Sequence, residues 1–256
     1  SVLRWKWTAI CGTAEGAVYA VGSGGIIWRL QNGSWAQMPS GTTAKLNGVW
    51  CSPEGPVYAV GNGGTILQLQ AGIWAAMPSG TAANLMGIYG SPDSGLFIVG
   101  NGGTILRLQG GGWMSMPSGT SANLNAVWGC ACTGLYAVGN GGTILHWNGS
   151  AWQLVASPTT KYIIGIDMLT ASDGWAVGGL WPEGEIYHWN GTAWSLVTTP
   201  SINEMMGVSM VSADDVWATS YYGGQILHWD GASWSIISNQ YSARGIQMLS
   251  ATDGWI

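Results

Sequence analysis

Histidine is the residue type in this 256-residue sequence best suited to metal binding or proton transfer, and it occurs at 146, 188 and 228. His146, His188 and His228 occupy the same position in successive units of a repeat of about 40 residues. Neighbouring sheets pack about 10 Å apart, whereas zinc ligands lie about 2.1 Å from one ion. We therefore predict no metal site and no cofactor, and we interpret each histidine as a half-buried ring beside the tryptophan that follows it.

The acidic residues do not form the pair that hydrolytic chemistry requires. Glycoside hydrolysis uses two carboxyl groups about 5–10 Å apart. Most of the 12 acids lie in turns, spread over the repeats, where Asp and Glu are common turn formers, so we expect a dispersed ring of carboxylates. The sequence also contains no P-loop, nucleophile elbow or dinucleotide fingerprint. We therefore predict that the chain is not an enzyme and has no catalytic residues.

Large aromatic side chains enter the loops of later repeats, where earlier repeats carry Asn-Gly-Gly or Pro-Ser-Gly-Thr. A loop that departs from the pattern of its own repeat is where function is expected. We predict a ligand- or partner-binding patch on the loop face of the fourth to sixth repeats. Its residues are Trp181, Tyr221, Tyr222, Tyr162, Tyr241 and Glu204. The alternative is that these rings cover the edge of the core or contact a missing seventh blade.

The elements that position these residues follow from the repeat itself. Six tryptophans recur at intervals of 39, 39, 39, 42 and 40 residues, and they are Trp35, Trp74, Trp113, Trp152, Trp194 and Trp234. Each unit resolves into four short β-type runs with turn signals between them. In the second unit the runs cover residues 46–51, 57–61, 65–70 and 74–77, and Asn62-Gly63-Gly64 supply the positive φ of a tight hairpin.

Four strands in about 40 residues is the blade period of a β-propeller. We predict one all-β domain over residues 1–256. Its repeats cover about 7–45, 46–84, 85–123, 124–162, 163–204 and 205–243, with a partial unit at 244–256. The count favours a seven-bladed propeller of which this chain is an incomplete piece, and a closed six-bladed ring with a trailing segment is the alternative. We interpret the recurring aromatic residues as blade packing.

Several repeated motifs carry a resemblance to known propellers. They are Leu46-Asn47-Gly48-Val49, Ala59-Val60-Gly61, Gly64-Thr65-Ile66-Leu67, Trp74, Ser79-Gly80-Thr81 and Asp173-Gly174-Trp175-Ala176-Val177-Gly178. The unit resembles the repeats of Ycf48-like photosystem assembly factors and of the related BNR, or Asp-box, propellers. The resemblance implies a propeller fold for the whole chain. The basic patch of the assembly factors is thin here, and the turn that precedes Trp234 is one residue shorter than an Asp box.

The BNR resemblance also implies sialidase-like glycoside hydrolysis as a minor alternative. This resemblance implies a site with an arginine cluster that binds a carboxylate, a tyrosine nucleophile and an acidic residue. The four arginines, Arg4, Arg29, Arg107 and Arg244, fall in different units, and only Arg29 and Arg107 are at equivalent places. We therefore expect no three of them to converge.

Composition excludes several classes of partner. The net charge is −5 with only seven Lys and Arg, so a nucleic-acid partner has no electrostatic basis. No apolar run approaches the roughly 20 residues that span a bilayer, so we expect no transmembrane segment. Only 7% of residues are charged, against roughly 25% in an average protein. Surface polarity must therefore come from Gly, Ser, Thr, Asn and Gln.

The four cysteines, Cys11, Cys51, Cys130 and Cys132, form no C-x-x-C motif, and no histidine lies at zinc spacing from them. We interpret them as buried or loop thiols. A disulfide between Cys11 and Cys51 is the alternative, because both fall on the same strand of neighbouring repeats. Cysteine usage leaves the redox compartment open.

Two classes of binding function remain. We predict a non-catalytic scaffold that mediates protein–protein interaction, as a Trp-rich, secreted subunit of an extracellular, cell-surface or periplasmic assembly. The low charge and the incomplete ring favour it. The alternative is a carbohydrate-binding lectin that uses the aromatic loop residues. The partner is thus a protein or a glycan, and the oligomeric state is not readable from these features.

Overall fold

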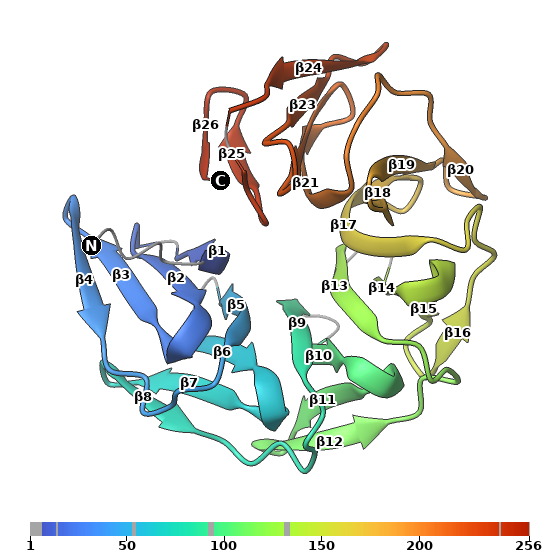
Figure 1. Ribbon diagram of the computed structural model, residues 1–256. Coiled ribbons are helices and arrows are strands. Elements are labelled where there is room, and N and C mark those ends of the chain that lie inside the picture. The colour runs from blue at the N-terminus through green and yellow to red at the C-terminus, as the bar shows by residue number, and fades with distance from the viewer. Residues whose placement is uncertain are drawn as a thin grey trace.

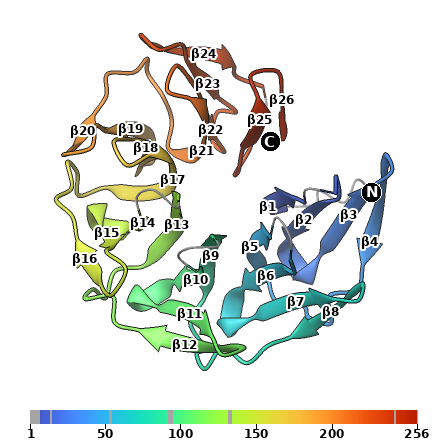
Figure 2. The same ribbon diagram turned by 180° about the vertical axis from the view of Figure 1, so that it is seen from behind.

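A computed structural model of the chain describes residues 7–13, 15–52, 55–91, 95–130, 134–240 and 242–255. These residues form six four-stranded antiparallel sheets that radiate from a central axis (Figure 1 and Figure 2). Within each sheet, or blade, the strands follow one another in chain order, and the first strand is innermost. The structure is therefore all-β and a propeller, as the repeat predicts.

The first three blades share this arrangement. Their strands are β1 (Trp7–Gly12), β2 (Val18–Gly22), β3 (Ile27–Gln31) and β4 (Ser34–Met38); β5 (Leu46–Cys51), β6 (Val57–Gly61), β7 (Ile66–Gln70) and β8 (Ile73–Ala76); and β9 (Leu85–Ser91), β10 (Gly95–Gly100), β11 (Ile105–Gln109) and β12 (Gly112–Met116).

The fourth, fifth and sixth blades repeat it. Their strands are β13 (Leu124–Cys130), β14 (Gly134–Gly139), β15 (Ile144–Trp147) and β16 (Trp152–Leu154); β17 (Tyr162–Thr170), β18 (Asp173–Leu180), β19 (Glu183–Trp189) and β20 (Trp194–Leu196); and β21 (Met205–Ser212), β22 (Asp215–Ser220), β23 (Ile226–Trp229) and β24 (Trp234–Ser238).

The number of blades differs from our prediction. The ring has six four-stranded blades, so the favoured seven-bladed arrangement is wrong. Beyond the sixth blade, β25 (Gln247–Ser250) and β26 (Asp253–Trp255) form a two-stranded sheet beside β21. Counting repeats misled because residues 244–256 match the first two strands of a unit, whereas a blade also needs two outer strands.

A single 3-10 turn joins the second and third strands in each of the first four blades. The four turns are η1 (Ser23–Gly25), η2 (Asn62–Gly64), η3 (Asn101–Gly103) and η4 (Asn140–Gly142). In η2 both glycines have positive φ, as the sequence predicts. A Cβ on Gly64 would lie 1.9 Å from the backbone oxygen of Thr81, so the turn packs directly against the loop that enters the next blade. Thr65 hydrogen-bonds to Asn62, and strand β7 therefore begins one residue later than predicted.

The hydrophobic core lies between neighbouring blades. In the first five blades the aromatic residue of the second strand meets, edge to face, the tryptophan of the next blade's fourth strand. These pairs are Tyr19–Trp74, Tyr58–Trp113, Phe97–Trp152, Tyr136–Trp194 and Trp175–Trp234. Their centroids lie 5.2–6.2 Å apart, within the range that such pairs prefer. The recurring aromatic residues are thus packing residues, as we interpreted them.

Polar and covalent contacts also tie the innermost strands to one another. The side chains that make these contacts occupy equivalent positions in their repeats. Each one reaches the next inner strand, at the residue that follows the equivalent position there. The contacts are the Cys11–Cys51 disulfide, the Tyr89 hydroxyl to Gly129 O, the Met210 N–H to Asp167 at 2.8 Å and the Met248 N–H to Ser209 at 3.0 Å. The thiol interpretation of Cys11 and Cys51 is therefore wrong. The Cys130 side chain and all of Cys132 lie outside the described residues.

Candidate functional site

Two neighbouring loops bring three of the predicted aromatic residues together. Trp181 lies in the two-residue turn between β18 and β19, and Tyr221 and Tyr222 lie between β22 and β23. The Trp181 and Tyr222 ring centroids are 6.4 Å apart at 69°, and those of Tyr221 and Tyr222 are 5.2 Å apart at 84°. Trp181 is 62% exposed and Tyr222 is 47% exposed. We call Trp181, Tyr221 and Tyr222, together with Arg244, the aromatic surface.

Arg244 completes this surface, although sequence reasoning gave it no role. Its guanidinium carbon lies 4.3 Å from the centroid of the Tyr221 ring, a cation–π distance. Glu204 lies within electrostatic range of the same guanidinium. Burial raises the pKa of the Glu204 carboxyl above its usual range, and the charge of Arg244 acts in the opposite direction. No repeat pattern signals this contact, because Tyr221 and Arg244 belong to different units.

Buried polar residues hold the β22–β23 loop in place. Ser220 donates to the Tyr222 carbonyl at 2.8 Å and accepts from the Gln225 N–H at 3.1 Å. The Gln225 side chain in turn accepts from the Asn203 N–H at 2.7 Å and donates to the Ser201 carbonyl at 3.3 Å. These bonds tie the loop to the segment that enters the sixth blade, so the exposed tyrosines stand on an ordered base.

The β18–β19 turn is held by an ion-pair network. Lys161 lies 3.0 Å from Glu183 and 2.9 Å from Glu185. Hydrogen bonds from Tyr187, Lys161 and Thr159 oppose the effect of burial and lower the pKa of the Glu185 carboxyl. Because Glu183 and Glu185 lie at the start of β19, this network fixes the end of the turn that carries Trp181.

Tyr162 does not join the aromatic surface. Tyr162 is 40% exposed at the start of β17, where its backbone pairs with Gly179. Within the part of the chain that the structure describes, no ring contact links Tyr162 to Trp181, Tyr221 or Tyr222. Tyr241 lies outside the described residues. The structure thus brings together three of the six predicted residues, namely Trp181, Tyr221 and Tyr222, and the charge of Arg244 acts on a fourth, Glu204.

The histidines and arginines occupy separate packing positions. His188 and His228 bond Asp173 and Asp215, at 2.7 and 2.9 Å. Each of the three histidines stacks near the aromatic residue of its own second strand, at 4.4–4.7 Å. Arg29 and Arg107 lie over aromatic rings in the first and third blades, and Arg4 is outside the described residues. Among the described residues, no three His, Cys, Asp or Glu side chains are grouped to hold a metal ion.

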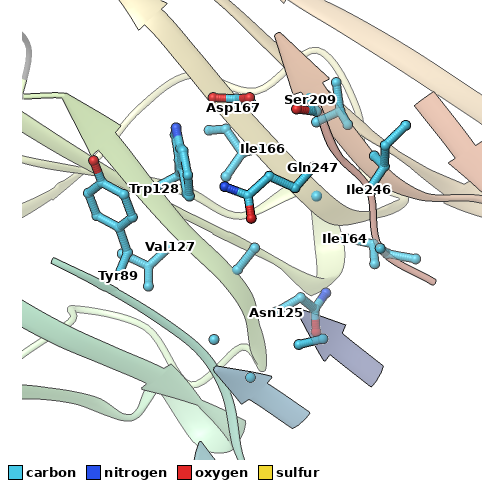
Figure 3. Close-up of a pocket in the computed structure, with 18 of the residues that line it drawn as sticks. Tyr89, Asn125, Val127, Trp128, Ile164, Ile166, Asp167, Ser209, Ile246 and Gln247 are labelled. Carbon is cyan, nitrogen blue, oxygen red and sulfur yellow. The ribbon is translucent and has the colours of Figure 1, made fainter. Parts of the chain in front are cut away.

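The inner strands surround a central cavity of about 510 Å³ (Figure 3). Figure 3 shows Tyr89, Trp128 and Asp167 on neighbouring inner strands at its wall. Burial raises the pKa of the Asp167 carboxyl to about 7, although donors from Met210, Met168 and Trp128 lower it. Burial and the charge of Asp167 raise the pKa of Tyr89 to about 12. Asp167 accepts hydrogen bonds from three blades, so we assign it a role in holding the ring together.

These features define the class of the protein as a six-bladed β-propeller with an aromatic surface on its loops. No family model matches the sequence, and no curated protein matches it. In the residues that the structure describes, no helix is long and apolar enough to span a membrane.

Solved structures with this fold include enzymes and binding proteins. Virginiamycin B lyase from Staphylococcus aureus is 17% identical with a TM-score of 0.84, and the match covers 94% of this chain and 88% of the lyase. YCF48 bound to D1 peptide is 16% identical with a TM-score of 0.75, covering 98% of this chain and 87% of YCF48.

The WD40 β-propeller domain of Doa1 is 10% identical with a TM-score of 0.79, covering 98% of this chain and 89% of that domain. At these identities the similarity is one of fold. The propeller part of the resemblance stated from the repeat motifs is therefore confirmed, and Ycf48 is among the structural neighbours. The fold is consistent with a protein-interaction scaffold, and by itself it does not separate binding from catalysis.

Proposed function

We propose that this chain is a non-catalytic propeller that binds a protein partner through the aromatic surface of Trp181, Tyr221, Tyr222 and Arg244. The observation that carries the proposal is the exposure of Trp181 beside Tyr222, on loops that depart from the repeat. Trp, Tyr and Arg are the residue types that most often dominate the energy of protein interfaces. The buried bonds of Ser220 lower the entropy that the surface would lose on binding.

The geometry favours a protein over a glycan. The rings meet edge to face at 69° and 84° and do not form a flat platform for stacking on a sugar. Arg244 covers one face of Tyr221. The YCF48 structure was solved with a bound D1 peptide, which supports the use of this fold for peptide recognition. A glycan remains the alternative ligand, and the experiment below separates the two.

The environment of the acidic groups supports a non-catalytic role. Asp167, the buried carboxyl at the central cavity, already accepts hydrogen bonds from Met210, Met168 and Trp128. A general acid or base needs an oxygen within about 2.6–3.2 Å of the reacting group. The pairs Asp173–His188 and Asp215–His228 belong to different blades, at repeat-equivalent places, so they do not form one catalytic group.

We further propose that the protein works in an oxidising compartment, namely outside the cell, at its surface or in a periplasm. The Cys11–Cys51 disulfide supports this, because structural disulfides persist in such compartments. Labelling of free thiols in protein taken directly from its source is expected to leave Cys11 and Cys51 unmodified until a reductant is added. Rapid labelling of both residues without reductant would contradict the proposal.

The binding proposal is tested with paired variants. The native partner is captured from the source on immobilised wild-type chain, purified, and titrated by calorimetry. Trp181→Ala is expected to weaken binding at least thirtyfold, the effect of losing about 2 kcal/mol at a central interface residue. Leu154→Ala is the matched control, since Leu154 is 66% exposed on β16 of another blade.

Equal affinity of the two variants would contradict the role of the aromatic surface. A glycan array probed with the wild-type chain forms the second arm. Saturable glycan binding that Trp181→Ala abolishes would replace the protein partner with a carbohydrate ligand. Circular dichroism of each variant confirms that the blades remain folded.

A further inference from the structure

The aromatic surface continues along the chain to Leu180, the last residue of β18. Leu180 is 50% exposed and precedes Trp181 directly. With Tyr222, which is also exposed, these side chains place three large apolar groups on the loops of the neighbouring fifth and sixth blades (Figure 1). Both of these blades have all four strands. The exposure therefore belongs to the loops themselves, and exposed apolar groups gathered in this way are typical of an interaction site.

The rings of the aromatic surface do not lie in one plane. Trp181 meets Tyr222 at 69°, and Tyr221 meets Tyr222 at 84°. A bound β-strand presents its side chains to two opposite faces, so its apolar residues would meet the surface in a single row. A polyproline II helix has three residues per turn, so its side chains point in three directions. Such a helix can pack against aromatic faces that are set steeply to one another.

The polar groups of the aromatic surface are mainly hydrogen-bond donors. An indole N–H and a guanidinium can only donate, and a tyrosine hydroxyl can also donate. Within the residues that the structure describes, no hydrogen bond is made by the Trp181 indole or by the hydroxyls of Tyr221 and Tyr222. A segment that complements these groups carries accessible carbonyl oxygens and few N–H groups. Proline supplies both properties, because it keeps its C=O and has no backbone N–H.

The charged groups around the aromatic surface compensate one another. Lys161 lies 3.0 Å from Glu183 and 2.9 Å from Glu185, and the charge of Arg244 acts on Glu204. Each of these cations thus has a carboxylate as its counter-charge. Because complementary charge on a partner must compete with these pairs, a charged peptide gains little here. An uncharged segment, held by ring contacts and hydrogen bonds, fits the surface better.

We propose that the aromatic surface binds an uncharged, proline-rich segment of the partner protein in the polyproline II conformation. Its pyrrolidine rings pack against Trp181 and Tyr222, and its carbonyl oxygens accept from the indole N–H and the tyrosine hydroxyls. This inference rests on the proposed function, because it names the part of the partner that the same surface recognises. Proline-rich segments bind aromatic-lined surfaces in this way because their helix is formed before binding. The bonds of Ser220 hold the β22–β23 loop as well, so both sides lose little entropy.

The probe for this inference is octaproline, capped at both ends and labelled with a dye. Fluorescence anisotropy of the peptide is followed as the full chain is added. Saturable binding is expected, with at least tenfold weaker binding of the capped peptides SGSGSGSG, which is flexible, and TVTVTVTV, which favours an extended strand and keeps its N–H groups. Equal binding of the three peptides, or no saturation by octaproline, would overturn the proposal.

Variants of the full chain test the site and its donors separately. Trp181→Ala is expected to weaken octaproline binding at least tenfold, and Trp181→Phe about fivefold, the effect of one lost hydrogen bond. Leu154→Ala is the control, since Leu154 is exposed on β16 of another blade, and it should leave binding unchanged. Wild-type affinity in Trp181→Ala would refute the site. Wild-type affinity in Trp181→Phe would refute the argument from hydrogen-bond donors, and circular dichroism confirms that each variant is folded.

Competition separates this inference from the proposed function. Octaproline is titrated into the complex of the full chain with its captured native partner, and displacement of the partner is expected. If the affinity of the partner depends on Trp181 while octaproline neither binds nor displaces it, the proline-rich segment is wrong and the proposed function stands. If Trp181→Ala changes neither affinity, the proposed function fails as well.

Discussion

Removing the Cys11–Cys51 disulfide is expected to lower the free energy of unfolding by about 4 kcal/mol at 25 °C. The bond joins the inner strands of the first and second blades across a sequence separation of 40 residues. Closing a loop of that length removes about 13 cal/mol/K of entropy from the unfolded chain, which corresponds to about 4 kcal/mol. Because domains are stable by only about 5–15 kcal/mol, the change is a large fraction of the total.

The measurement is urea unfolding of Cys11→Ser/Cys51→Ser, followed by tryptophan fluorescence. Wild type and variant both carry Cys130→Ser and Cys132→Ser, so that only one bond changes. Tyr89→Phe is the matched control, since it removes only a hydrogen bond, from the hydroxyl to Gly129 O, at the equivalent position between the third and fourth blades. That loss is expected to be about 1 kcal/mol.

The two variants must therefore differ by about 3 kcal/mol if the covalent bond acts mainly on the unfolded chain. The slope of free energy against urea is also expected to rise, because the unfolded chain without the bond exposes more surface. A loss no greater than that of Tyr89→Phe would refute the loop-closure argument. Coincident transitions by fluorescence and circular dichroism are needed for the two-state analysis.

Two other perturbations test the packing and the inner strands. Trp74→Ala is expected to cost about 3–5 kcal/mol, as for a buried tryptophan. Trp35→Ala, at the same repeat position but 41% exposed, should cost at least ~2 kcal/mol less, and similar losses in urea unfolding would contradict this difference in burial. Burial raises the pKa of Asp167 to about 7, so the folded chain holds that proton more tightly than the unfolded chain. Its stabilising effect is full below about pH 4 and disappears as pH rises through 7, a change on the order of 4 kcal/mol. Asp167→Asn is expected to flatten this part of the stability–pH curve, and an unchanged curve would show that the carboxyl is not protonated in the folded chain.

The local structure could be predicted because each repeat contains the same pattern of strands and turn residues. Strands β5 and β6 begin and end where the sequence places them, since Gly and Pro mark every turn. The position of Trp74 inside a blade interface also follows from its regular recurrence. The number of blades does not follow in the same way, because a matching inner pair such as β25–β26 is not by itself a blade.

The candidate site was predictable only in part, because some of its contacts join different repeats. Trp181 stands out because it lies in an insertion into a repeated loop, and Tyr222 stands out because it replaces a small residue. Arg244 does not stand out, because its contact with Tyr221 depends on how the segment after the sixth blade passes the β22–β23 loop. A contact between units of a repeat depends on their relative placement, which residue spacing within one unit does not encode.

A repeat protein can depart from its own rule in two ways, and only one of them is visible in the sequence. Trp181 departs in residue type, and the loop comparison finds it. Trp35 keeps the residue type of Trp74 and departs only in its environment, because burial depends on the neighbouring blade and not on the repeat. The same indole that is buried between two blades elsewhere is thus partly exposed beside Trp255. Repeat-equivalent residues in a propeller of this kind should therefore be compared for their exposure, as well as for their residue type.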